Sequence, residues 1–140
     1  MNDEVSTVIE FDEDISLAEQ PEPLPKGDYS FTIVGAEPRV SGNSGNTYAA
    51  ITMQISPDDF PADYPVENAP DGVRLIYRRV VLENERNARY RLRKFCEAIG
   101  APMSTRMDLN DWLGLRGVCT VDHESYEGEM RAQVVRVKAE

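Results

Sequence analysis

Few residues in this chain are suited to metal or redox chemistry. Its 140 residues include two cysteines and one histidine. Cys96 and Cys119 are 23 positions apart, which fits neither a zinc site nor a disulfide framework, so we expect buried thiols in a reducing compartment. His123 has no Cys or His at ligand spacing. The sequence therefore predicts no metal site and no cofactor.

Signals for catalysis, membrane insertion and secretion are missing as well. No Ser or Cys lies in a nucleophile motif. The acidic pairs Asp58/Asp59 and Asp108/Asp111 are explained more simply by a loop and a helix cap than by paired catalytic acids. No apolar run approaches the roughly 18–20 residues of a membrane span, and the N-terminus lacks the basic and apolar segments of a signal peptide. We expect a non-enzymatic cytoplasmic protein.

Basic residues are absent from the first 24 positions, which hold eight acids within a chain of net charge −10. This segment has no sustained period and ends in PEPLP, so we predict a disordered acidic arm over 1–24 and a folded domain over 25–140. Such an arm reaches roughly 27 Å, far enough to meet its own domain. It is a solubility tail, or it docks through its apolar residues Val8, Ile9, Phe11 and Ile15.

Hydrophobic periodicity predicts five strands and one helix. The predicted strands cover 28–40, 47–56, 73–82, 115–124 and 129–138, with the last two joined at SYEG as a hairpin. The helix follows Asn84, its expected N-cap, and stops at Gly100. The expected core residues are Tyr29, Phe31, Ile33, Ala49, Ile51, Met53, Ile55, Ala88, Leu92, Phe95, Cys96 and Ile99.

Two segments between these elements are predicted to be loops. Residues 57–72 hold four of the nine prolines and five acids, with Phe60 and Tyr64 as possible anchors. SGNSGN (41–46) is a flexible turn and not a phosphate loop, because it lacks Gly-Lys-Ser/Thr and a strand follows it. A short helical turn is expected over 108–114.

The resulting order is β-β-β-α-β-β, which is the connectivity of the OB-fold. That fold is a small, mainly β, five-stranded barrel that binds oligonucleotides or oligosaccharides on its second and third strands and adjoining loops. A fold alone does not give a function, which depends on the side chains that the fold presents.

Positive charge is concentrated in the middle of the chain. Residues 74–106 contain nine Lys or Arg and three acids, a local charge of +6. Tyr77 and Tyr90 lie within this segment. A basic and aromatic segment in an acidic chain indicates a face that binds a polyanion.

Sequence-tolerant binding of single strands needs cations for phosphates and aromatic faces for bases. The candidates on the sheet are Tyr48, Arg74, Tyr77, Arg78, Arg79 and Tyr126. Because strand side chains alternate, Arg79 can share a face with Tyr77, while Arg74 and Arg78 form the other set. We favour Tyr77 with Arg79 and Tyr48. The alternative is that Tyr77 belongs to the core.

A second group of candidates lies on the predicted helix. Its members are Arg86, Arg89, Tyr90, Arg93 and Lys94. They flank the nucleic-acid groove, or they form a solvated helix face.

Several segments together resemble a family of small phage and prophage proteins that are catalogued as a domain of unknown function or as single-stranded DNA-binding proteins. They are PKGDYSFTIVGAE, SGNTYAAITMQI, NERNARYRLRKFCEAIGAP and LRGVCTVDHESYEGEMRAQV. The similarity covers about residues 25–138. The resemblance implies a non-enzymatic OB-type protein of phage replication or recombination, acting in the host cytoplasm. Acidic tails of single-strand binders are commonly C-terminal, whereas here the acids are N-terminal.

The first hypothesis is therefore a single-stranded DNA-binding protein whose acidic arm competes with DNA or recruits replication or recombination proteins. The alternative is a protein-interaction module or DNA mimic that uses the acidic arm and the 57–72 loop. No membrane partner is expected, and the sequence favours no particular oligomeric state.

Overall fold

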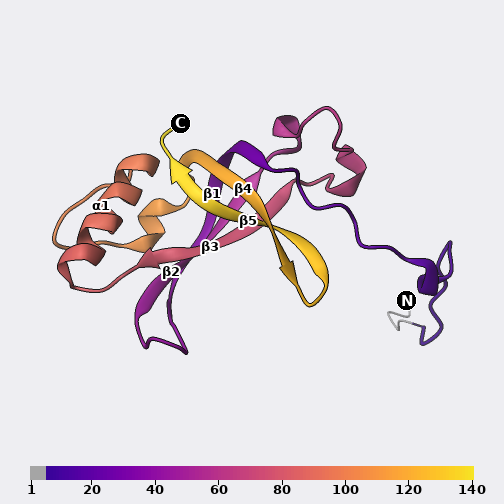
Figure 1. Ribbon diagram of the computed structural model, residues 1–140, viewed down its shortest axis with the longest axis horizontal. Helices are drawn as coiled ribbons and strands as arrows, with labels where there is room; N and C mark the ends of the chain where they lie inside the picture. Colours follow the sequence, from indigo (N-terminus) through magenta and orange to yellow (C-terminus); the bar gives the residue numbers. More distant parts are fainter. Residues whose placement is uncertain (1–5) are drawn as a thin grey trace, which may run out of the picture.

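Five strands form one antiparallel sheet in the computed structural model, which describes residues 6–140 (Figure 1). Their order across the sheet is β3-β2-β1-β4-β5, so β1 lies at the centre and β3 and β5 are the edges. The strands are β1 Gly27–Val40, β2 Thr47–Ile55, β3 Val73–Val81, β4 Arg116–Tyr126 and β5 Glu129–Lys138. The mainly β fold and the predicted order of elements are confirmed.

The chain passes from the edge strand β3 to β4, the neighbour of the other edge strand, through α1 (Arg86–Ile99) and the short 3-10 helix η4 (Leu109–Trp112). α1 lies at one end of the sheet and packs against both edge strands and β4 (Figure 1). The edge strands contact each other, but no ladder within residues 6–140 joins β3 to β5. The predicted five-stranded, partly open barrel is therefore seen as a sheet that is not closed, and α1 packs against both of its edge strands.

The core forms from the strand faces that the alternation predicted. Tyr29, Phe31 and Ile33 of β1 are buried, and so are the predicted core residues of β2. The helix adds Ala88, Phe95, Cys96 and Ile99, with Leu92 partly buried beside them. Trp112 from η4 is 1% exposed, and its ring lies 5.4 Å from that of Phe95.

A close backbone approach occurs where β4 crosses β1. Gly117 pairs with Phe31, and a Cβ added at Gly117 would lie 2.8 Å from the Phe31 ring. Because Phe31 is itself 1% exposed, the ring has no free space to move into. Glycine is required at this position by the packing of the core.

The N-cap of α1 is Glu85 and not the expected Asn84. The Glu85 carboxylate accepts the N–H groups of Asn87 at 2.9 Å and Ala88 at 3.1 Å, and these bonds lower the pKa of Glu85. Asn84 instead accepts a hydrogen bond from Arg89. The predicted helix end is confirmed, because Gly100 caps it with a left-handed φ of 71°.

The hairpin between β4 and β5 is tighter than SYEG suggested. β4 continues through Tyr126, which pairs with Glu129, so only Glu127 and Gly128 form the turn. Both have positive φ, 51° and 82°, which is the backbone of a two-residue type I′ turn. Tyr126 therefore belongs to a strand.

A β-bulge shifts the register between β2 and β3. Ile51 pairs with Tyr77 and Ala49 pairs with Val80, so Arg78 and Arg79 both lie opposite Ala50. Such a bulge interrupts the alternation of faces along β3. The bulge therefore determines which arginines lie beside Tyr48.

The loop from 56 to 72 contains two short 3-10 helices, η2 (Pro57–Asp59) and η3 (Val66–Asn68). Phe60 and Tyr64 pack edge to face at 5.1 Å. Tyr64 is 5% exposed, and its hydroxyl donates to the carbonyl of Glu22 at 3.0 Å. These two rings anchor the loop, and Tyr64 also ties it to the segment that precedes β1.

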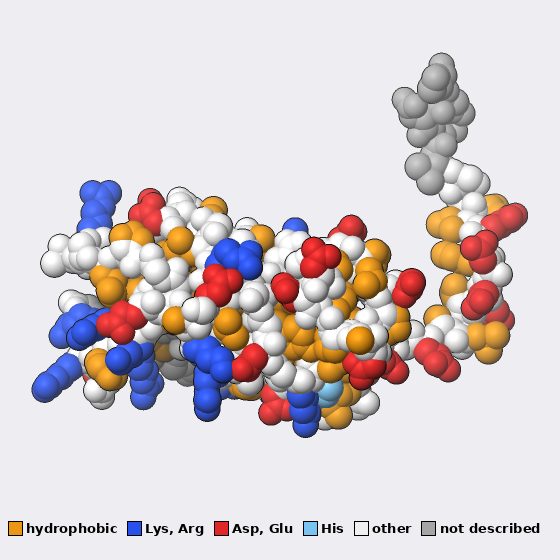
Figure 2. Space-filling view, turned by 90° about the horizontal axis from the view of Figure 1, so that it is seen from above, with side chains coloured by type: hydrophobic (Ala, Val, Ile, Leu, Met, Phe, Trp, Pro, Cys, Tyr) orange, Lys and Arg blue, Asp and Glu red, His pale blue; other side chains and the backbone are white. Residues whose placement is uncertain are grey.

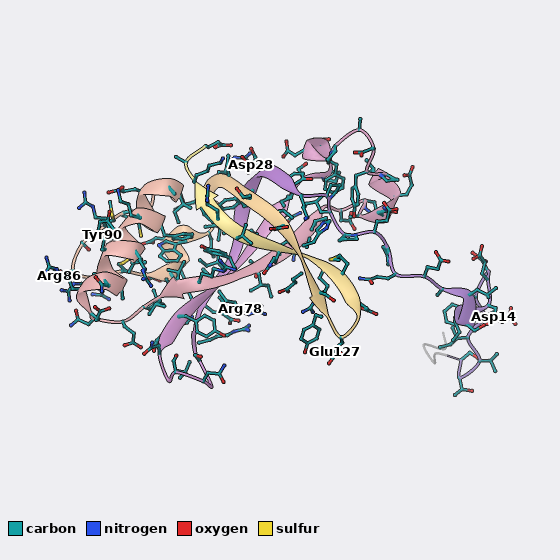
Figure 3. All side chains as sticks on the ribbon, in the orientation of Figure 1. Asp14, Asp28, Arg78, Arg86, Tyr90 and Glu127 are labelled. Atoms are coloured by element: carbon teal, nitrogen blue, oxygen red, sulfur yellow. The ribbon has the colours of Figure 1, made fainter. Side chains whose placement is uncertain are left out.

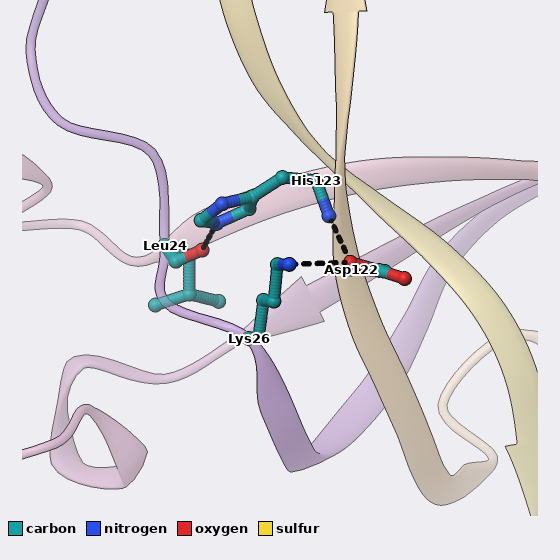
Figure 4. A network of polar contacts seen from close by, with 4 residues as sticks. All are labelled: Leu24, Lys26, Asp122 and His123. Atoms are coloured by element: carbon teal, nitrogen blue, oxygen red, sulfur yellow. Dashed lines mark hydrogen bonds and ion pairs between the residues drawn. The ribbon is translucent and has the colours of Figure 1, made fainter.

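The last residues of the predicted acidic arm pack on the sheet. Leu24 is 2% exposed and belongs to the core. Its carbonyl oxygen lies 2.8 Å from His123 Nε2, while Asp122 accepts the His123 N–H and pairs with Lys26 at 3.4 Å (Figure 4). Packing against the core thus begins before residue 25. Residues 6–19 are exposed, and Figure 1 shows them leading away from the sheet at the end opposite α1.

Cys96 and Cys119 are free thiols with no exposed surface. Burial raises the pKa of Cys96 and raises the pKa of Cys119 to about 11. Both thiols are therefore protonated at neutral pH, and the prediction that they are buried is confirmed.

Candidate nucleic-acid interface

The first candidate surface is the open face, which we define as the side chains of β1, β2 and β3 that point away from the core. Thr52 pairs with Ile76 and Gln54 pairs with Arg74 across β2 and β3, and these side chains do not join the core. The other members on these two strands are Tyr48, Ala50 and Arg78. The open face is therefore small and polar in the middle, with larger side chains around it.

Three shallow hollows follow one another along the open face. The first, about 380 Å³, is lined by Val34, Ala50 and Ile76 among others. A second of about 340 Å³ lies between the 41–46 turn, Tyr48 and Arg78. A third of about 310 Å³ shares Val34 with the first. We call these three hollows the groove of the open face; the first and third are contiguous at Val34, whereas the second has no lining residue in common with them.

Two arginines of the open face are free of acidic partners: Arg78, which lines the second hollow, and Arg74, which lines none of the three. No ion pair in residues 6–140 includes Arg74 or Arg78. Arg39 also lines the groove but is paired with Glu37, which raises the pKa of Arg39. Arg116 is paired with Glu140 at 3.3 Å. Arg74 and Arg78 therefore have the guanidinium donors that are available to phosphates.

Tyr48 is the aromatic residue that the structure brings to these arginines. It lines the second hollow together with Arg78, and it lies opposite Arg39 across β1 and β2. Its half-buried ring is held at the base of the 41–46 turn. The prediction that Arg74 and Arg78 share a face is confirmed, and Tyr48 joins that set.

Tyr77 does not belong to the open face. Its ring stacks on Phe95 of α1 at 6.1 Å with an interplanar angle of 20°, and burial raises the pKa of its hydroxyl. The favoured combination of Tyr77 with Arg79 and Tyr48 was therefore wrong, and the core alternative for Tyr77 is confirmed. Packing against the helix decides this position, because the core lies on that side of β3.

The helix residues form a second, separate basic surface. Arg86, Arg89, Tyr90, Arg93 and Lys94 are all exposed on α1. Arg93 pairs with Glu97 at 2.8 Å, and Lys94 lies over the Tyr90 ring at 5.7 Å. Figure 3 shows Arg86 and Tyr90 at the helix end of the molecule, away from Arg78 near the β1–β2 turn. The helix residues and the open face are therefore not one continuous row.

Tyr126 lies on the β4–β5 hairpin, apart from both surfaces. Its ring is 52% exposed, and the Arg131 guanidinium lies 4.0 Å above the ring centre. Arg131 also pairs with Glu124 at 3.6 Å. One face of the Tyr126 ring is thus covered by Arg131 of the adjacent strand β5, which leaves the other face of the ring for stacking.

Charge is separated along the long axis of the molecule. Figure 2 shows Lys and Arg side chains gathered toward the α1 end and Asp and Glu toward the end that carries the arm. The separation follows the sequence, because the basic 74–106 segment contains α1 and the acids concentrate in the first 24 residues. An approaching polyanion is therefore attracted to one end of the molecule despite its net charge of −10.

The described residues show neither a metal cluster nor a membrane span. No group of three or more Cys, His, Asp or Glu in residues 6–140 is arranged to hold a metal ion. Within the same residues, no helix has the length and apolar character to cross a membrane.

A family model described as "Protein of unknown function (DUF669)" matches residues 11–137. The chain belongs to this family. The DUF669 match includes residues 11–24 of the acidic arm, α1 and the whole sheet except Lys138, the last residue of β5. No curated protein matches the chain significantly.

Proposed function

We propose that this DUF669 protein binds single-stranded DNA without sequence preference through the open face. The observation that carries the proposal is that Tyr48 and Arg78 line one shallow hollow, while Arg74 lies farther along the same face of β3, opposite Gln54. Guanidinium groups neutralise phosphates, and a tyrosine ring stacks on any base, so this combination suits a single strand of any sequence.

Strand order supports the same proposal. In the OB-fold, the second and third strands and the β1–β2 loop bind oligonucleotides. Here the order β3-β2-β1-β4-β5, with contact between β3 and β5, corresponds to an OB-fold whose closing ladder is absent. We propose that the sheet is OB-type. Its groove, lined by the 41–46 turn and β2, then lies where that fold binds its ligand.

A cellular role follows from the resemblance to phage proteins. A non-enzymatic single-strand binder acts in replication or recombination, in the cytoplasm of the host. The acidic arm then competes with DNA for a basic surface or recruits another protein of the same process.

Fluorescence anisotropy of a labelled oligothymidylate at several salt concentrations tests the proposal. If about four phosphates are contacted, the slope of log K against log salt is about −3. The RNA oligomer of equivalent sequence serves as a comparison for substrate class. Undetectable binding of both at low salt, by the full chain and by a chain without residues 1–19, rejects the proposal.

The protein-interaction alternative rests on the exposed apolar residues of the arm, which are unusual in an acidic tail. Phe11 is 65% exposed and Ile15 is 68% exposed. Recovery of a basic protein partner by the arm, with no oligonucleotide affinity, favours that function over DNA binding.

A further inference from the structure

A groove between α1 and the 103–110 segment has not been assigned to any role. It encloses about 910 Å³ and continues into a neighbouring hollow of about 350 Å³. The two share Arg89, Leu92, Ser104 and Met107 in their walls. This α1 groove lies on a different part of the molecule from the open face, since none of its lining residues belongs to β2 or to the middle of β3.

The floor of the α1 groove is apolar. Leu82, Leu92, Met107 and Leu109 line it and are only partly buried by the core. Met103 extends the apolar surface and is 51% exposed. A contiguous apolar groove of this kind on a soluble domain marks a site that another chain covers.

Three arginines border the α1 groove: Arg89, Arg106 and Arg93, the last of which is paired with Glu97 at 2.8 Å. Two carboxylates also line its wall and are hydrogen-bonded to the backbone: Glu83 accepts the Thr47 N–H at 2.6 Å, and Asp108 accepts the Asn110 N–H at 2.9 Å. Arg89 and Arg106 pair with no acid among residues 6–140. The groove therefore fits a ligand that is both apolar and acidic.

The arm of this same chain has that chemistry. Between residues 6 and 19 it carries five acids. Its five large hydrophobic side chains are between 65% and 73% exposed, and they are Val8, Ile9, Phe11, Ile15 and Leu17. Neither the arm nor the groove has an apolar partner in the structure of residues 6–140. The apolar side chains and acids of the arm therefore complement the apolar floor and the arginines of the α1 groove.

The arm cannot place residues 8–17 together in the groove of its own chain, because its Ile15 end is held too far away. The Gln20 side chain is bonded to the Met130 carbonyl at 3.1 Å, and Leu24 is buried, so the arm starts at the hairpin end. The groove lies beside Ala36, about 30 Å along β1 from Gly27. The five residues from Gln20 to Ile15 span at most about 17 Å. Figure 1 and Figure 2 both show the arm and α1 at opposite ends.

We propose that residues 8–17 of one copy bind in the α1 groove of a second copy. The apolar side chains occupy the floor, and the acids of the arm face Arg89, Arg93 and Arg106 at the rim. Because arm and groove are different surfaces at opposite ends, the contact is head to tail and propagates from copy to copy. This self-association does not depend on the DNA-binding proposal.

Two double variants of the full chain test this contact. Phe11→Ser with Ile15→Ser disables the arm and leaves the groove intact. Met103→Glu with Arg106→Glu disables the groove and leaves the arm intact. A matched control, Val66→Glu with Arg136→Glu, changes an exposed apolar residue and an exposed arginine elsewhere. Circular dichroism and thermal unfolding establish that all three variants are folded like the parent chain.

Sedimentation velocity over a concentration series gives the readout. The parent chain and the control form oligomers that grow with concentration and dissociate at high salt. Each double variant alone is monomeric. An equimolar mixture of the arm variant and the groove variant forms dimers and nothing larger, because one intact arm then meets one intact groove. A monomeric parent chain at high concentration overturns the proposal, and so does a mixture that fails to dimerise.

A peptide of residues 6–19 provides a second, independent measurement. Labelled and titrated with the arm variant, it binds, and it loses at least about tenfold in affinity when Phe11 is replaced by Ser. The groove variant does not bind it. Equal binding of the peptide to arm and groove variants would place its site elsewhere and reject the α1 groove.

Discussion

Removing the two free arginines of the open face gives the sharpest test of DNA binding. The variant Arg74→Gln with Arg78→Gln keeps both side chains polar and long while removing two positive charges. Neither residue pairs with an acid in residues 6–140, and both are exposed. The substitutions therefore leave the fold intact and no acid without its partner.

The expected magnitude follows from counterion release. Each phosphate contact with single-stranded DNA contributes about 0.7 to the slope of log K against log salt, so losing two contacts lowers a slope of about 3 by about 1.4. Counterion release contributes little to binding near 1 M salt, so the variant and the parent chain should bind about equally there. At about 0.1 M, tenfold lower, a slope that is smaller by about 1.4 makes the variant's binding constant about 25-fold weaker. The reduction is uniform across oligonucleotide sequences, since phosphates carry no sequence information.

Anisotropy titrations of the parent chain, the variant and a charge-matched control give the comparison. The control, Lys26→Gln with Arg136→Gln, has the same net charge but removes cations that lie outside the three strands of the open face. We expect its slope to equal that of the parent chain. A double variant that keeps the parental slope, or a control that loses as much, would refute the assignment of phosphate contacts to the open face.

Three further changes test other parts of the structure. Tyr48→Ala is expected to lower DNA affinity by about 5- to 150-fold, the contribution of one stacked base, with an unchanged salt slope; an unchanged affinity would remove Tyr48 from the site. Gly117→Ala should lower the free energy of unfolding by about 1–3 kcal/mol in urea denaturation, because its Cβ meets the Phe31 ring at 2.8 Å. The control Gly42→Ala, with open space around it, should be neutral. Glu85→Gln should flatten the loss of stability in acid. The pKa of Glu85 is lowered below its ordinary 4.5 by two helix N–H groups, so its contribution is present above that pH and lost as pH falls through the lowered value. Unfolding midpoints at acid and neutral pH that shift equally in both proteins would contradict this.

The alternation of apolar residues was sufficient to predict the strands of the core. In β2, Ala49, Ile51, Met53 and Ile55 are separated by smaller or polar residues, and only one placement buries all four. In α1, the stripe from Ala88 to Ile99 determined the buried face in the same way. Where one face of a strand or helix is buried, the spacing of apolar residues in the sequence predicts which face it is.

The candidate site was harder to predict because it lies on β3, where both faces carry arginines. The alternation of side chains along a regular strand allowed Tyr77 to lie with Arg79 on an exposed face. The structure turns Tyr77 toward Phe95, a residue distant in the sequence, and places a bulge after it. A bulge has no signal in this strand, since no glycine marks it. The groove residues Arg39 and Arg116 were missed because they come from β1 and β4, outside the basic segment.

The N-cap of α1 could not be predicted from residue type alone, because neighbouring side chains are engaged in other hydrogen bonds. Asn84 is the stronger N-cap by residue type, yet Glu83 is bonded to the Thr47 N–H and Asn84 to Arg89. Glu85 is left to accept the helix N–H groups. The two-residue turn at Glu127 and Gly128 was also not predicted. Glu127 adopts a left-handed φ, which glycine or asparagine at this position would have indicated and glutamate does not.

The complete burial of both native thiols has a practical consequence for spectroscopy. With Cys96 and Cys119 inaccessible and protonated at neutral pH, a maleimide dye has no native target on the folded chain. A cysteine introduced at the exposed Asn43, in the turn beside Tyr48, can then be labelled alone, without first replacing any native residue. A fluorophore there would sense ligand entering the groove while the interior remains chemically untouched.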